Sequence, residues 1–382
     1  MNTKANIQAI DALEVLDSRG FPTVQVIVKL DNGIVAQAMV PSGASTGEYE
    51  AHELRDGEKD RFMGKGVQKA VTNIVESIAP ALQGMNVLEL KAIDERLIEL
   101  DGTENKTKLG ANAILGVSIA CAQAGAAALG IPLFRYLGGS NASQMPVPLV
   151  NVINGGAHAA NSLDFQEFML VPHCGDSFAR NIRAASEVFH TLKKNLLKDG
   201  HTVGLGDEGG FAPNLGSSEE AIKVLLDAIS DAGYQPGKDF SLALDVAASE
   251  FYDRSKSCYI LKKSSGEELS SKDLIGLYAD WAKRYPLVSI EDGLDENDWD
   301  GWQALTAELG SSVQLVGDDL FVTNSKRLQM GIDQKAGNAI LIKLNQIGTV
   351  SETLATIELG RKHGYRSVIS HRSGETEDTT IA

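Results

Sequence analysis

Cysteine is scarce in this sequence, and the few cysteines are scattered. The three among 382 residues are Cys121, Cys174 and Cys258, and no two of them form a Cys-x-x-Cys pair. The sequence therefore offers neither a zinc-binding pattern nor a disulfide framework. This predicts a reducing compartment, the cytoplasm, and the first residues, Met1–Asn6, lack the apolar segment typical of a signal peptide.

Basic residues are also in deficit. Lys and Arg number 35 against 51 Asp and Glu, which gives a net charge of −16. An acidic protein of this kind binds nucleic acid and anionic membranes poorly, so we expect neither as a direct partner. A small anionic substrate stays compatible with this charge if its site is locally cationic.

Charge is missing altogether from one stretch, Leu109–Phe134, which is long enough to span a bilayer. The stretch is rich in Ala and Gly, contains Asn112 and Gln123, and is interrupted by Gly130 and Pro132. Small residues let a helix pack closely in a core. We therefore predict a buried helix of a soluble domain and no membrane span.

The first third of the chain predicts an α+β domain. Residues 5–40 alternate as strands do, with a hairpin turn at Asp31-Asn32-Gly33, and helical patterns follow over residues 65–99 and 111–129. Strands followed by helices are typical of α+β domains. We predict an α+β N-terminal capping domain with an active-site lid over residues 1–138, and a catalytic domain over residues 139–382.

The second domain predicts an eight-stranded β/α (TIM-like) barrel with an irregular start, so the fold class is α/β. The first two strand candidates have no helix-length segment between them, whereas the later ones alternate with helical stretches. The eight candidates are Val147–Ile153, Phe165–Val171, Val203–Glu208, Ser241–Asp245, Leu287–Glu291, Val313–Asp318, Ala339–Lys343 and Arg366–His371.

Four of these strands end in residues that can do chemistry: Asp245, Glu291, Asp318 and Lys343. The C-terminal strand ends of a β/α barrel open onto one face, which carries the active site. Three carboxylates there would repel one another unless a cation lay between them, and oxygen ligands suit Mg²⁺. A lysine beside bound Mg²⁺ is pushed towards its neutral form, which makes it a candidate base. The pattern predicts metal-assisted proton abstraction, although each acid alone could be a helix N-cap or a surface residue.

Two glycine-rich motifs have alternative interpretations. Gly204–Gly209 matches G-x-G-x-x-G, but its two acids would repel phosphate, so we interpret it as a turn that presents Glu208 at the barrel mouth. Ser42–Gly47 lacks the Gly-Lys-Ser/Thr of a P-loop. It is either a flexible linker or a lid that closes on substrate, with Gly43 and Gly47 as hinges.

The last strand runs into His371-Arg372-Ser373-Gly374. An arginine, a hydroxyl and exposed N–H groups can cradle a phosphate or carboxylate, and the last βα loops of barrels often bind phosphate. The alternative is a surface loop. His158, which follows a Gly-Gly pair, is either structural or functional on this sequence alone.

Six blocks resemble the signature blocks of enolase of the bacterial type, the glycolytic 2-phosphoglycerate dehydratase. They lie in the family's order, and the likeness runs from Ile7 to Ala382. The blocks are Ser42–Gly47, Gly206–Pro213, Ser289–Leu294, Gly317–Leu320, Leu341–Gly348 and Ser370–Asp378.

The resemblance implies a lyase that reversibly dehydrates 2-phosphoglycerate to phosphoenolpyruvate in glycolysis and gluconeogenesis. It also implies two Mg²⁺ ions per active site and a homodimer or higher homo-oligomer. Asp245, Glu291 and Asp318 would hold the first ion, and Ser42 would help to hold the second.

The same resemblance implies roles for the remaining residues. Lys343 would take the C2 proton, and Glu208 would protonate the departing C3 hydroxyl with assistance from Glu167. The implied substrate contacts are His158, Gln166, Glu167, His371, Arg372 and Ser373.

Other interpretations stay open. Muconate-lactonising and racemase-like relatives carry Lys-x-Lys on the second strand, where this chain has Phe165-Gln-Glu-Phe-Met, which argues against them. Enolases continue past the position of Ala382 by several tens of residues, including a further substrate-binding lysine, so we expect the last barrel helix to be incomplete. That difference favours an inactive relative or binding scaffold. The presence of the expected metal-ligand, acid and base residues favours an enzyme. A secondary role at the cell surface or outside the cell is also compatible with the family.

Overall fold

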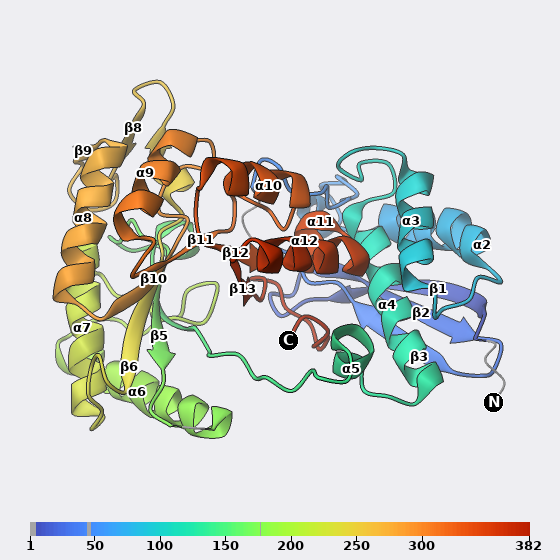
Figure 1. Cartoon of the computed structure of the whole chain (residues 1–382), viewed down its shortest axis with the longest axis horizontal. Helices are drawn as coiled ribbons and strands as arrows, with labels where there is room; N and C mark the ends of the chain where they lie inside the picture. The colour runs from blue at the N-terminus through green and yellow to red at the C-terminus, as the bar shows by residue number, and fades with distance from the viewer. Residues whose placement is uncertain (1–4, 44–46, 176) are drawn as a thin grey trace. The chain divides into compact units, whose positions relative to one another are not determined.

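The computed structural model describes residues 5–43, 47–175 and 177–382 (Figure 1). It divides into two compact units, and each unit combines separate stretches of sequence. The first unit comprises Met1–Ser143, Phe321–Gln329 and Leu341–Ala382, and the second comprises Gln144–Leu320 and Met330–Ile340. The boundary expected at residue 138 stays a prediction.

A three-stranded antiparallel sheet underlies the first unit. Its order is β1 (Ile7–Leu16), β2 (Pro22–Leu30) and β3 (Val35–Met39). The alternation that predicted these strands is reflected in burial, since Val24, Val26 and Val28 are all fully buried. The predicted hairpin turn joins β2 to β3, and Gly33 adopts a φ of 85° there, which glycine tolerates without strain.

Helix α4 (Ala111–Leu129) packs against this sheet. The approach is close, because a Cβ atom on Gly116 would lie 2.6 Å from Val26 Cγ2. Among the described residues, α4 is the one helix long and apolar enough to cross a membrane, and 78% of its most apolar window is buried inside the protein. The predicted buried helix is confirmed.

Shorter helices complete the first unit. The predicted helix over residues 65–99 is interrupted, because Gly84 takes a φ of 81° and ends one segment before the next begins. The elements are α1 (Gln68–Asn73), α2 (Ala79–Leu82), α3 (Leu90–Asp101), α5 (Leu133–Gly138), α11 (Leu344–Ile347), α12 (Val350–Lys362) and strand β13 (Arg366–Ile369).

Most strands of a seven-stranded mixed sheet lie in the second unit, and the order of that sheet is β13-β12-β11-β10-β6-β5-β4. Strand β4 runs antiparallel to β5, β5 runs antiparallel to β6, and β6, β10, β11 and β12 then run parallel. Every residue of β5 and β6 is buried, as expected of strands covered on both faces. The bounds are β4 (Val150–Asn154), β5 (Glu167–Pro172), β6 (Phe240–Asp245), β10 (Leu287–Glu291), β11 (Gln314–Gly317) and β12 (Ala339–Ile342).

Helices follow the later strands of this sheet, and a small sheet of three short strands follows β6. The helices are α6 (Phe178–Lys198), α7 (Ser218–Asp231), α8 (Ser271–Arg284), α9 (Trp299–Leu309) and α10 (Ser325–Gln334). The short strands are β7 (Tyr252–Asp253), β8 (Cys258–Ile260) and β9 (Glu268–Leu269). The irregular start predicted for the barrel is thus an antiparallel pair.

One predicted strand is wrong. Residues Val203–Glu208 form a turn in which Leu205 makes an isolated bridge to Phe211 and the Gly206 N–H donates to the Gly210 carbonyl. The cause is local, because Gly-Asp-Glu-Gly-Gly favours a reversal and Gly209 has a φ of 83°. The segment also opens no helix, since α7 begins only at Ser218, so it does not form the dinucleotide-binding turn that a G-x-G-x-x-G motif can indicate.

Candidate active site

Three acids lie side by side at one edge of the sheet in the second unit. Asp245 ends β6 and Glu291 ends β10, and the two residues are direct partners in the parallel ladder. Because β5 is antiparallel, its first residue, Glu167, lies at this same edge and is paired with Asp245. All three are buried, at 6%, 8% and 9% exposure respectively.

Asp318 belongs to a second group of acids at the end of β11. Its N–H donates to Asp292 Oδ1 at 2.9 Å, and the N–H of Asp319 donates to Asp292 Oδ2 at 2.8 Å. Ligand oxygens of Asp292, Asp318 and Asp319 all lie within 4.8 Å of one another. The sequence reasoning missed Asp292 and Asp319, although the signal was available as paired acids, Glu-Asp and Asp-Asp, after successive strands.

His158 and Glu208 form a third part of this region. His158 ends a short 3-10 turn after β4, and its Nδ1 lies 3.0 Å from Glu208 Oε2, an ion-pair distance without hydrogen-bond alignment. Ligand atoms of His158, Glu167 and Glu208 lie within 4.8 Å of one another. The turn over residues 205–211 therefore brings Glu208 to Glu167, although Glu208 lies on a turn and not at the end of a strand.

Gln166 links β5 to β6 by its side chain. Its Nε2 donates to Asp245 Oδ2 at 2.8 Å, and its backbone N–H donates to the Asp245 carbonyl. Gln166 Oε1 is buried and accepts no hydrogen bond from the described part of the protein. The side chain that carries this acceptor therefore lies against one of the carboxylates.

The concentration of acids perturbs their ionisation. Burial raises the pKa of the Glu167 carboxyl well above its ordinary value, and the neighbouring Glu208 raises it further. Burial raises the pKa of Asp292 in the same way, with added repulsion from Asp319 and Asp318. Burial lowers the pKa of His158, but the Glu208 carboxylate outweighs this effect and the net direction is upward.

Asp245 and Glu291 are not helix caps. Asp298 caps α9 with its own side chain, and Asp245 Oδ1 instead accepts the N–H of Ala247 within its own loop. Lys343 stands at the first position before α11 without a capping hydrogen bond from its side chain. The alternative reading of the strand-end acids as caps is therefore excluded for Asp245 and for Glu291, which lies seven residues before Asp298.

The donor set fits a divalent cation. Buried carboxylates that raise one another's pKa are stabilised when a cation lies among their oxygens, and Mg²⁺ prefers oxygen ligands. The two acid groups described above supply such oxygens, and the candidates are Asp245, Glu291, Asp318, Asp292 and Asp319.

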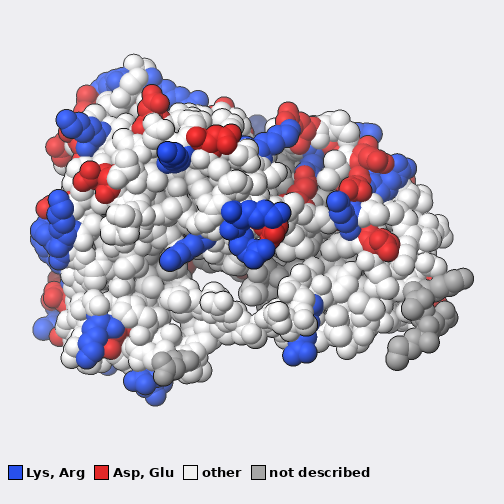
Figure 2. All heavy atoms as spheres, viewed as in Figure 1, with Lys and Arg blue, Asp and Glu red and all other residues white. Residues whose placement is uncertain are grey.

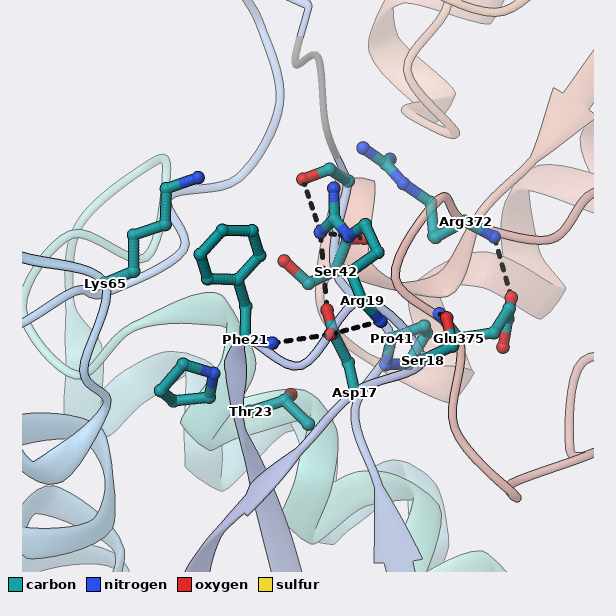
Figure 3. Close-up of polar contacts among 12 residues, drawn as sticks. Asp17, Ser18, Arg19, Phe21, Thr23, Pro41, Ser42, Lys65, Arg372 and Glu375 are labelled. Carbon is teal, nitrogen blue, oxygen red and sulfur yellow. Dashed lines mark hydrogen bonds and ion pairs between the residues drawn. The ribbon is translucent and has the colours of Figure 1, made fainter. Parts of the chain in front are cut away.

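The remaining predicted residues belong to the first unit. Ser42 is 1% exposed, and its Oγ donates to Glu53 and accepts from Arg55. Its backbone pairs with Gly374 in an antiparallel bridge, and Arg19 donates to its carbonyl (Figure 3). The predicted lid includes residues 44–46, which lie outside the described residues.

The three residues of the predicted anion cradle differ in their exposure to solvent. Arg372 is buried, Ser373 is half-buried and His371 is exposed. The Arg372 N–H donates to Glu375 Oε1 at 2.7 Å, which fixes the loop next to Ser42 (Figure 3). Lys343 follows β12, and its N–H donates to Thr323 Oγ1 at 2.9 Å.

Fold and site together define an α/β-barrel protein with an acid-lined strand edge that could hold a cation, and an α+β domain before it. Residues 142–382 match the family model described as the C-terminal TIM barrel domain of enolase, and residues 7–137 match its N-terminal domain. The chain belongs to the enolase family. The fold predicted from sequence is thereby confirmed, and membership indicates a lyase.

Proposed function

We propose that this protein catalyses the reversible, Mg²⁺-dependent dehydration of 2-phosphoglycerate to phosphoenolpyruvate, the step that serves glycolysis and gluconeogenesis. The observation that carries the proposal is the buried edge where Glu167, Asp245 and Glu291 lie in register, with the Asp292–Asp318–Asp319 group after the next strand. Such an edge suits a substrate that is recognised through bound cations.

Two Mg²⁺ ions would be held by Asp245, Glu291 and Asp318 and, on the lid side, by Ser42. When bound, they would stabilise the negative charge that develops on the substrate carboxylate as the adjacent proton leaves. Asp292 would contribute by orienting Asp318, because it accepts the backbone N–H of that residue.

Lys343 would act as the base. Its Nζ takes the C2 proton, and the electron pair left behind forms the C2–C3 double bond as the C3–O bond breaks. Hydroxide is a poor leaving group, so a second residue must protonate it. Glu208 would supply that proton, with Glu167 beside it as the partner whose raised pKa keeps a proton in the pair.

Arg372, Ser373, His371, His158 and Gln166 would bind the anionic substrate. Arg372 is suited to phosphate because its planar guanidinium can donate two parallel hydrogen bonds. Gln166 would offer its buried Oε1 or its amide to the bound substrate and ions.

The compartment and partners are part of the proposal. All three cysteines are free thiols, which supports a reducing cytoplasm. Basic side chains lie among acidic ones on the face in Figure 2, which with the net charge of −16 gives no support to a nucleic-acid partner. We expect a homo-oligomer, which sedimentation of the purified protein would test.

The direct test is turnover. Purified protein mixed with 2-phosphoglycerate and Mg²⁺ should produce the enol-phosphate, seen as rising ultraviolet absorbance, and a chelator should stop it. Absence of the product with Mg²⁺ present, from protein with a cooperative thermal melt, would refute the proposal.

A further inference from the structure

Glu50 is an acid with a buried side chain just after the Ser42–Gly47 loop, and the proposed mechanism does not use it. Its side chain is 7% exposed and lies against that of Arg372, which is 4% exposed. Arg372 Nη1 is 3.3 Å from Glu50 Oε1 and 3.4 Å from Oε2. A buried carboxylate is costly unless it is paired in this way, so the contact fixes both side chains.

The same carboxylate has two further donors. Gln346 Nε2 donates to Glu50 Oε1 at 3.1 Å, and the Gly47 N–H donates to that oxygen at 3.3 Å. One oxygen therefore joins the guanidinium to the described end of the loop and to α11.

The connection continues from Gln346 to Lys343. Gln346 is 1% exposed, and its Oε1 accepts from Thr323 Oγ1 at 2.7 Å. That hydroxyl in turn accepts the backbone N–H of Lys343 at 2.9 Å. A continuous chain of hydrogen bonds thus runs from Arg372 through Glu50, Gln346 and Thr323 to the backbone of the proposed base.

The segment that carries Glu50 is held at a second point. The guanidinium of Arg327, which is 8% exposed, lies over the ring of Tyr49 at 3.8 Å from the ring centroid. Two adjacent residues, Tyr49 and Glu50, therefore engage two buried arginines, and this fixes the position of Glu50 independently of its own ion pair.

We propose that Glu50 is a positioning residue that holds the Arg372 guanidinium for a phosphate oxyanion and ties it to the Lys343 strand and to the end of the Ser42–Gly47 loop. A guanidinium has five N–H donors, so it can hold Glu50 and an oxyanion together. The inference rests on the proposed function, since it assumes that Arg372 meets the substrate phosphate.

The test is a double-mutant cycle between Glu50 and Arg372. Glu50→Gln is nearly isosteric and should raise KM for 2-phosphoglycerate about tenfold, roughly the effect of one charge-assisted hydrogen bond, with a smaller effect on kcat. Arg372→Lys should raise KM at least as much. The double variant should be no worse than Arg372→Lys alone, because Glu50 acts through that side chain.

Two further variants make the cycle specific. Glu58→Gln removes one negative charge from an exposed position in the same segment and should leave KM unchanged. Glu50→Asp keeps the charge and should recover most of the lost affinity. Thermal melts of all variants test for loss of fold. If Glu50→Gln unfolds at a lower temperature than the wild type, the comparison of affinity is made with Glu50→Asp instead.

Inorganic phosphate is the probe that separates this inference from the proposed function. The same cycle measured by calorimetry with phosphate should give a matching loss in Glu50→Gln, whether or not the protein turns over 2-phosphoglycerate. Additive effects of the two substitutions, an unchanged phosphate affinity in Glu50→Gln, or a Glu50→Asp variant as weak as Glu50→Gln would each overturn the role of Glu50.

Discussion

Replacing Asp292 by asparagine tests whether the acid-lined edge is organised for a cation. Asp292 is 4% exposed, and its two oxygens accept the N–H groups of Asp318 and Asp319 at 2.9 and 2.8 Å. An asparagine of the same shape keeps one acceptor oxygen and places an NH₂ group opposite the other N–H. One of the two residues should then lose its orientation.

The magnitude follows from the lost contact. A hydrogen bond to a charged acceptor contributes about 1.5–3 kcal/mol, so Mg²⁺ affinity should fall by roughly ten- to a hundredfold. Stability without metal should change less. The lost hydrogen bond is offset because asparagine is neutral. The substitution therefore relieves both the burial of a charged group and the repulsion from Asp319 and Asp318, which together raise the pKa of Asp292.

The assay is Mg²⁺ calorimetry on the variant and the wild type, with thermal melts in chelator. Asp300→Asn is the matched control, since Asp300 is an exposed acid in the first turn of α9 and its loss changes net charge equally. Unchanged Mg²⁺ affinity in Asp292→Asn, or equal loss in Asp300→Asn, would refute the reasoning.

The strand ends could be predicted because apolarity and chemistry change at the same residue. The runs ending at Asp245 and Glu291 match the ends of β6 and β10, and the run ending at Lys343 overshoots β12 by one residue. Buried parallel strands read as continuous apolar segments, so their ends stand out in sequence.

Strand direction could not be predicted in this way. An apolar run has no polarity along the chain, so nothing local in Phe165–Val171 indicated that β5 runs against β6. That reversal places Glu167, at the start of its strand, beside Asp245 at the end of its own. Glu167 was predicted only from the family resemblance. The antiparallel pairing supplies the physical reason why it lies in the site.

Contacts between residues far apart in the chain also could not be predicted from the sequence. Glu50 reads as a solvated acid in a polar loop, yet its partner Arg372 lies 322 residues further along the chain. Asp292 likewise reads as a second acid after a strand. Its φ is 40°, a backbone conformation that the sequence does not indicate, and its carboxylate accepts the N–H groups of the next loop.

The remaining predictions concern the chemistry, the phosphate and pH. Lys343→Ala should abolish exchange of the substrate C2 proton with solvent, whereas Glu208→Gln should keep that exchange and lose dehydration. The exchange can be followed by NMR. Exchange at the normal rate in Lys343→Ala would show that Lys343 is not the base. Arg372→Lys should impair substrate binding despite keeping its charge, because lysine lacks the planar fork, and unchanged kinetics would contradict this.

The last prediction is a pH dependence of the stability of the metal-free protein. Glu167 and Asp292 have raised pKa values in the folded state, so between the ordinary carboxyl pKa and these raised values the folded protein holds more protons than the unfolded chain. Their contribution to stability is therefore greatest at low pH and is lost as pH rises through the folded-state pKa values. In thermal melts with chelator, Glu167→Gln should lose less stability than the wild type as pH rises, and Mg²⁺ should stabilise the wild type more at higher pH because binding displaces these protons. Parallel pH profiles of stability for Glu167→Gln and the wild type would contradict this prediction. A stabilisation by Mg²⁺ that is independent of pH would show that cation binding does not displace the protons of the buried acids.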